Sequence, residues 1–119
     1  MRSNAHNKLQ DIIKERYQAA GWIAIKEHYI NGKKIDVLAQ NIETKYTIAN
    51  EVQLALKHYK ENILLDLEVG CDEVRIISIS KKVSEQIENK ALRELDEELL
   101  KKVRFLTIEE FIPNSDNNK

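Results

Sequence analysis

The order of apolar and polar positions along the chain predicts a helix, then a strand and a tight turn. Apolar residues recur at helical spacing over residues 5–20, and Gly21 stands where a helix-ending glycine is favoured. Residues 22–29 are rich in β-branched and aromatic side chains, which favour a strand. Asn31-Gly32 follows directly and is a strong signal for a two-residue hairpin turn.

The next part of the chain predicts two more strands and a second helix. Residues 33–39 and 46–53 have the apolar pattern of short strands, and a polar turn of hairpin size joins them. We therefore expect the first three strands to form an antiparallel meander. Over residues 55–69 the period becomes helical. The solvated face of this helix is expected to carry Lys57, Lys60, Glu61 and Asp66.

The last third of the chain predicts a strand, a helix and a strand. Residues 73–80 form a nearly continuous β-branched run, which is typical of an interior strand buried on both faces. Because a helix precedes this strand, we expect it to lie parallel to an earlier strand. Residues 84–102 predict an amphipathic helix that Lys81-Lys82 precedes, and residues 103–107 predict a short final strand.

These elements predict one domain of the α/β class with the order α-β-β-β-α-β-α-β and a mixed central sheet. A chain of 119 residues, 42% of them hydrophobic, can bury one core. The domain is expected to span residues 1–112, and the polar residues 113–119 are expected to form a disordered tail.

Composition and charge narrow the functional classes. The chain has 19 basic and 20 acidic residues, whereas non-specific nucleic-acid binders usually have a basic excess. Binding to nucleic acid would then need a metal ion or a local cluster of lysines. Cys71 is the single cysteine, so no intrachain disulfide can form, and no apolar run approaches the roughly 20 residues of a membrane span. We expect a soluble, cytoplasmic protein with no membrane partner.

Two acids stand inside the apolar sequence of neighbouring strands. Asp36 and Glu51 occupy positions where a carboxylate is costly to bury, and Gln53 follows on the same strand face as Glu51. Together they predict a divalent-metal site. The alternatives are a turn or edge position for Asp36, a cross-strand ion pair of Glu51 with Lys34 or Lys45, and a polar strand end at Gln53.

The motif Asp36, then Glu51-Val52-Gln53, in this order of elements resembles the PD-(D/E)XK nuclease superfamily, which includes restriction endonucleases and archaeal Holliday-junction resolvases. The resemblance covers residues 5–106. Residues 50–74 look especially like nuclease-like domains appended to some prokaryotic DNA-translocating ATPases. The resemblance implies a restriction endonuclease-like αβββαβ core, to which a C-terminal helix and a short strand are added.

The resemblance also implies a function. It implies a metal-dependent DNA endonuclease-type domain that hydrolyses phosphodiester bonds, weakly or only within a larger DNA-processing assembly. Mg²⁺ or Mn²⁺ would be held by Asp36, Glu51 and the carbonyl of Val52. The implied partners are DNA and an ATPase or other DNA-processing protein, and a homodimer would fit the two-strand cleavage of many such nucleases.

Gln53 is the chief departure from the family pattern, which has a lysine at this position. Glutamine cannot transfer a proton at neutral pH, although it can position a water. The implied catalytic group is therefore Asp36, Glu51 and Gln53, with Lys57 or Lys60 from the next helix as a substitute ammonium. From the first helix, the candidate contributors are His6, Gln10 and Glu15.

The lysines leave the functional class open. Contacts to DNA phosphates are expected from Lys33, Lys34, Lys57 and Lys60, although a solvated face explains these residues equally well. The alternative to an active nuclease is a catalytically inactive nuclease-fold module for DNA binding or protein docking. A scaffold domain without a nucleic-acid role is the third class.

Overall fold

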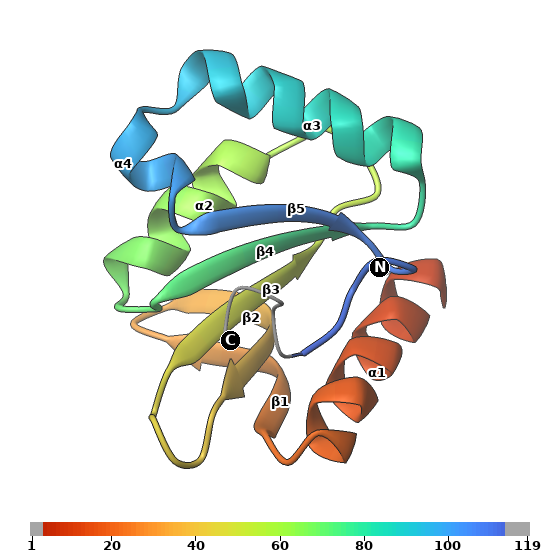
Figure 1. The fold of residues 1–119 in the computed structure, drawn as a ribbon, viewed down its shortest axis with the longest axis vertical. Helices are drawn as coiled ribbons and strands as arrows, with labels where there is room; N and C mark the ends of the chain where they lie inside the picture. Colours follow the sequence, from red (N-terminus) through yellow and green to blue (C-terminus); the bar gives the residue numbers. More distant parts are fainter. Residues whose placement is uncertain (1–3, 114–119) are drawn as a thin grey trace.

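The computed structural model describes residues 4–113, in which helices and strands alternate along the chain (Figure 1). The elements are α1 (Asn4–Ala19), β1 (Ile23–Ile30), β2 (Lys33–Gln40), β3 (Thr47–Val52), α2 (Tyr59–Glu68), β4 (Glu73–Ser78), α3 (Lys81–Glu94), α4 (Glu97–Leu100) and β5 (Val103–Thr107). This confirms the predicted α/β class. Residues 114–119, most of the predicted tail, lie outside the described residues.

The strands form one five-stranded mixed sheet in the order β1-β2-β3-β4-β5. The first three strands pair antiparallel, as predicted, and Asn31 and Gly32 both have positive φ in the turn between β1 and β2. A type I′ hairpin turn needs this combination. β4 pairs parallel with β3, and β5 pairs parallel with β4. The mixed sheet and the parallel crossover are therefore confirmed.

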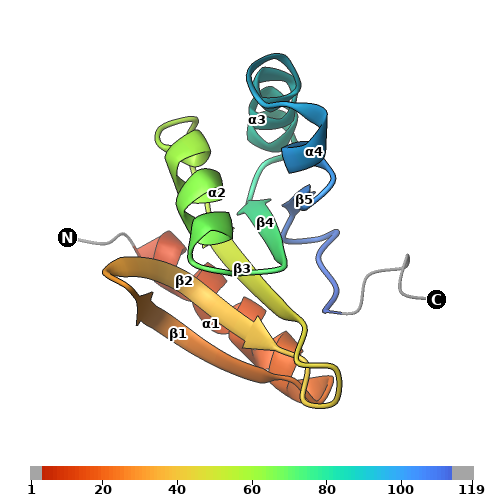
Figure 2. The same ribbon diagram turned by 90° about the vertical axis from the view of Figure 1, so that its left-hand side faces the viewer.

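The helices cover both faces of the sheet, with α1 on one face and α2 and α3 on the other (Figures 1 and 2). On the α1 face, Ile13 and Tyr17 pack with Val37 and Ile77. All six residues of β4 are buried, which fits the expectation for an interior strand. The second cluster joins α2 and α3 to the opposite face of the sheet, through Tyr59, Ile63, Val74, Ile76 and Ile87.

The helix predicted over residues 84–102 is wrong at both ends. The Ser80 hydroxyl accepts a hydrogen bond from the Val83 N–H at 3.2 Å, so the helix begins at Lys81 and includes the lysine pair. At the other end Leu95 is extended, and the Asp96 carboxylate accepts from the Leu99 N–H at 2.9 Å to start α4. Local capping bonds therefore divide the predicted helix into two.

A C-terminal segment after β5 is held on the α1 face by two arginines. Arg16 Nη1 donates to the carbonyls of Ile108 and Phe111, at 2.7 and 3.1 Å. Arg75 Nη1 donates to the carbonyl of Ile112 at 2.7 Å. Phe111 is buried beside Tyr17, so this segment completes the core on that face. None of the helices in residues 4–113 has the length and apolar character needed to span a bilayer.

Candidate functional site

Asp36 and Glu51 lie where β2 and β3 stop pairing. The final pair between the two strands is Val37 with Asn50, and the two acids lie one residue beyond this pair on adjacent strands. Asp36 Oδ2 accepts a hydrogen bond from the Val52 N–H at 2.9 Å, which gives this backbone donor a side-chain acceptor. Both acids are buried, at 7% and 2% exposure. The two predicted acids are thus positioned together at the point where the strands separate.

Helix α1 brings His6 to this pair. His6 Nε2 lies 3.3 Å from Asp36 Oδ2. Gln10, one turn later, is fully buried, and neither of its amide atoms has a hydrogen-bond partner among residues 4–113. Glu15 is exposed. Of the three candidates on this helix, His6 is therefore the one that contacts a predicted site residue.

β2 changes its buried face at Asp36. Val37 packs in the cluster beneath α1, but Ile35 packs in the cluster beneath α2, although strict alternation would put both on one face. Glu27 lies on β1 between the residues paired with these two, and its φ is +51°. The backbone irregularity at Glu27 and Asp36 thus turns the start of β2 toward α2.

Lys33 is directed into the protein as a result. Its Nζ lies 3.0 Å from Glu51 Oε2 and 3.2 Å from Asp66 Oδ1. It also donates to the Lys34 carbonyl at 2.6 Å. Glu51 therefore does form an ion pair, but with Lys33 and not with Lys34 or Lys45, which were the alternative partners. The Lys33 ammonium, predicted to contact DNA, is held among internal acceptors.

Asp66 is the site residue that sequence reasoning missed. It is predicted on the solvated face of the helix, but it is fully buried, and its Oδ1 lies 3.2 Å from Lys33 Nζ. The helix begins at Tyr59, so Tyr59, Ile63 and Asp66 have the spacing of one face. This spacing could have indicated that Asp66 is buried, but a charged residue on a helix is normally predicted to face solvent.

The cluster contains three acids, Asp36, Glu51 and Asp66, and the one ammonium of Lys33, so its acidic groups outnumber its basic group. Burial, the neighbouring Asp66 and the charge of Asp36 together raise the pKa of Glu51 above its usual range. Burial likewise raises the pKa of Asp66. Burial would lower the pKa of Lys33, but the charges of Glu51 and Asp66 outweigh it and raise that pKa. The cluster therefore favours an added proton or cation.

Gln53 holds the loop between β3 and α2. Its Nε2 donates to the carbonyls of Ala55 and Lys57, at 2.9 and 3.0 Å, and its Oε1 accepts from Asn62 Nδ2 at 2.8 Å. Both amide hydrogens are thus used within the loop, which also explains why α2 begins at Tyr59 and not at residue 55. This geometry favours the structural alternative for Gln53 over water positioning.

The other predicted lysines lie outside the buried cluster. Lys57 and Lys60 are exposed, and Lys34 is half-buried. It is the backbone carbonyl of Lys57 that binds Gln53, while its side chain is at the surface. The ammonium beside Glu51 comes from Lys33 on β2, and not from α2.

The donor chemistry of the cluster suits a hard divalent ion, because Mg²⁺ and Mn²⁺ prefer carboxylate oxygens. The carboxylates of Glu51 and Asp66, however, are both paired with the Lys33 ammonium. In residues 4–113, no three His, Cys, Asp or Glu side chains are arranged so that they could hold a metal ion. Lys33 Nζ lies between Glu51 and Asp66 instead, at 3.0 and 3.2 Å from their oxygens.

Comparison of the chain with protein-family models, with curated proteins and with solved structures found no match. Membership of a nuclease family therefore stays a proposal that rests on the motif, the order of elements and the geometry above.

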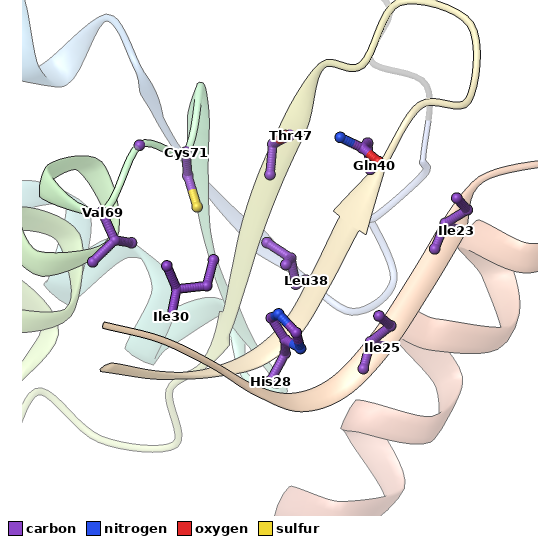
Figure 3. Close-up of a pocket in the computed structure, with 10 residues that line it drawn as sticks. Ile23, Ile25, His28, Ile30, Leu38, Gln40, Thr47, Val69 and Cys71 are labelled. Atoms are coloured by element: carbon purple, nitrogen blue, oxygen red, sulfur yellow. The ribbon is translucent and has the colours of Figure 1, made fainter. Parts of the chain in front are cut away.

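A concave region lies away from this cluster. It has a volume of about 380 Å³ and lies over the first three strands, beside the end of α2 (Figure 3). Its lining includes Ile25, His28, Leu38 and Cys71, and none of the predicted site residues. The hollow and the acidic cluster are thus two separate features.

Cys71 should be almost unreactive in the folded protein. Burial raises the pKa of its thiol from 9.0 to about 12, and the thiolate is the reactive form. Three pKa units lower the thiolate fraction at pH 8 by roughly a thousandfold. With Ellman's reagent, we expect one thiol to react promptly in denaturant and very slowly in native buffer. A prompt reaction in native buffer would contradict the burial of this side chain.

Proposed function

We propose that this chain is a nuclease-fold domain of the PD-(D/E)XK type that hydrolyses phosphodiester bonds in DNA with a divalent metal ion. The order α1-β1-β2-β3-α2-β4 supports an αβββαβ core, with α3, α4 and β5 as additions. One observation carries the proposal. Asp36 and Glu51 are buried neighbours on adjacent strands, at the point where those strands separate.

The chain's own residues would hold and orient the ion. Asp36 and Glu51 would be its carboxylate ligands, and the resemblance adds the Val52 carbonyl. The Val52 N–H and His6 fix the orientation of Asp36 before any ion binds. When bound, Mg²⁺ or Mn²⁺ would neutralise charge on the phosphate and activate a water.

Lys33 also supports this proposal. The resemblance implies an ammonium beside the second acid, and Gln53 cannot supply one. Lys33 Nζ lies 3.0 Å from Glu51 Oε2, so the ammonium is present but comes from the start of β2. The site therefore has a cation beside Glu51 although position 53 is a glutamine.

The second candidate function is an inactive nuclease-fold module that binds DNA or docks a protein. The observation that favours it is the amide of Gln53, which is fully engaged in holding the loop. In that case Asp36, Glu51 and Lys33 would have a structural role and no catalytic role.

Cleavage assays separate the two functions. The purified chain is incubated with branched, duplex and single-stranded DNA in Mg²⁺, in Mn²⁺ and with EDTA. We expect slow cleavage of at least one substrate with metal and none with EDTA. The absence of metal-dependent cleavage on all three substrates, together with the absence of Mn²⁺ binding by calorimetry, would overturn the first function. Salt-sensitive DNA binding without cleavage would favour the second.

Replacing Gln53 with lysine should destabilise the fold and should not increase cleavage. Lysine has no acceptor for Asn62 and cannot reproduce the planar amide bonds to the loop carbonyls. We expect a loss of about 1–3 kcal/mol in the free energy of unfolding, measured in urea. Gln86→Lys, on the exposed face of α3, is the matched control and should change stability by less than about 0.5 kcal/mol. New cleavage by Gln53→Lys would instead identify a lost lysine at this position.

A further inference from the structure

Strand β1 lies at one edge of the sheet, so within residues 4–113 only one of its two sides pairs with another strand. It also exposes apolar side chains, because Ile23, Ile25 and Tyr29 are 46%, 44% and 65% exposed. At the other edge, every residue of β5 is buried or half-buried. An open strand edge with exposed apolar side chains is a template for pairing with a further strand. β1 is therefore the edge that best fits a partner strand.

The side chains of β1 are distributed symmetrically over its length. Ile23, Ile25, His28 and Ile30 all line the hollow over the first three strands (Figure 3). In a regular strand Ile25 and His28, three residues apart, would lie on opposite faces. The backbone irregularity at Glu27, with its positive φ, lies between them and accounts for the change of face. The order of faces is thus the same when β1 is followed from either end.

We propose that β1 pairs antiparallel with β1 of a second copy of this chain, about a two-fold axis between Lys26 and Glu27. In antiparallel pairing, residues directly opposite each other lie on the same face. Only this register places each of the four hollow-lining residues of β1 opposite another of the four. The matched pairs are Ile23 with Ile30 and Ile25 with His28. The two sheets then become one continuous sheet, and both hollows open on the same face of it.

The same register brings opposite charges together at the axis. Lys26 lies opposite Glu27 of the second copy, and the two-fold symmetry repeats this pair. Opposite charges at facing positions stabilise strand pairing, and like charges destabilise it. Lys26 Nζ lies 2.6 Å from Asp11 Oδ1 in its own chain, but its side chain is 29% exposed and an ammonium has three donors. It can therefore contact a second carboxylate.

The match of faces and the match of charges are independent of each other. The first depends on the backbone at Glu27, and the second depends on the order of the side chains at positions 26 and 27. Charged residues in the middle of an edge strand deter pairing with strands that do not neutralise them. A second copy of β1 supplies both opposite charges at the required positions, so it is the partner that this edge favours.

Charge reversal tests this pairing by sedimentation equilibrium. The unmodified chain should associate to twice the 13.9 kDa mass of one chain. Lys26→Glu would place acids opposite acids, and Glu27→Lys would place ammonium groups opposite ammonium groups. We expect either variant alone to dimerise at least about tenfold more weakly. An equimolar mixture of the two variants should regain dimerisation, because every glutamate then faces a lysine.

Lys82→Glu is the matched control, since it makes the same change of charge at an exposed position of α3. It should dimerise as the unmodified chain does. Circular dichroism checks that each variant is folded, and a misfolded variant could not regain dimerisation in the mixture. An unmodified chain that stays monomeric at every concentration would overturn the proposal. So would a dimer that both variants retain, or a mixture that stays monomeric.

Amide hydrogen exchange gives a second test on the unmodified chain, so it does not depend on the folding of any variant. Exchange is compared below and above the midpoint of dimerisation. We expect the amides of residues 23–30 to exchange more slowly in the dimer, while those of β5 exchange at the same rate in both samples. Slower exchange in β5, with β1 unchanged, would place the contact at the other edge and contradict the proposal.

Discussion

Replacing Asp36 with asparagine should reduce metal-dependent DNA cleavage by at least about a hundredfold, because losing a proposed ligand should cost at least as much as losing a residue that only orients one. Asparagine keeps an oxygen that can accept the Val52 N–H bond, so the strand separation should persist. It lacks the negative charge that a divalent ion requires from its ligands. We therefore expect normal circular dichroism and thermal unfolding, with cleavage nearly lost.

Asp11→Asn is the matched control for this variant. Asp11 is a second aspartate in an ion pair, but its side chain is 54% exposed and its partner is Lys26. Its replacement should leave the cleavage rate unchanged. Equal cleavage by Asp36→Asn and the unmodified chain would contradict a catalytic role for Asp36, and so would equal losses in both variants.

Replacing Arg75 with methionine should lower the free energy of unfolding by about 3–5 kcal/mol, as expected when one partner of a buried ion pair is removed. Arg75 is 1% exposed, and its Nε lies 2.6 Å from Glu73 Oε2. It also anchors the Ile112 carbonyl and lies over the Phe111 ring. Because Tyr46 still donates to Glu73, the loss should lie toward the lower end of this range.

Arg104→Met tests whether burial, and not charge alone, sets this cost. Arg104 is opposite Arg75 on β5 and lies 3.6 Å from the same carboxylate oxygen of Glu73, but its side chain is 31% exposed. Its replacement should cost less than about 1 kcal/mol. Urea unfolding of both variants gives the comparison. Similar losses for the two would contradict the structural role assigned to Arg75.

The order of the elements could be predicted because each has a strong local signal. The Asn31-Gly32 turn and the β-branched run of β4 specify a hairpin and an interior strand without reference to the rest of the chain. The boundaries of the helices could not be predicted as well. They depend on hydrogen bonds that the side chains of Ser80 and Asp96 accept from backbone N–H groups, and on the contacts of the Gln53 amide within the loop before α2.

The candidate site was predictable in part for a similar reason. Asp36 and Glu51 stand out because an acid within an apolar strand is unusual, whatever the final structure. Lys33 and Asp66 could not be placed in the same way. The direction of Lys33 depends on the change of face at Asp36, and the burial of Asp66 depends on how α2 packs on the sheet. Both facts arise from tertiary structure.

Anomalous diffraction from crystals soaked in Mn²⁺ tests the central claim most directly. We predict a manganese peak in contact with carboxylate oxygens of Asp36 and Glu51. Manganese peaks confined to other parts of the surface, with Lys33 still paired to both acids, would contradict the claim that these acids form a metal site.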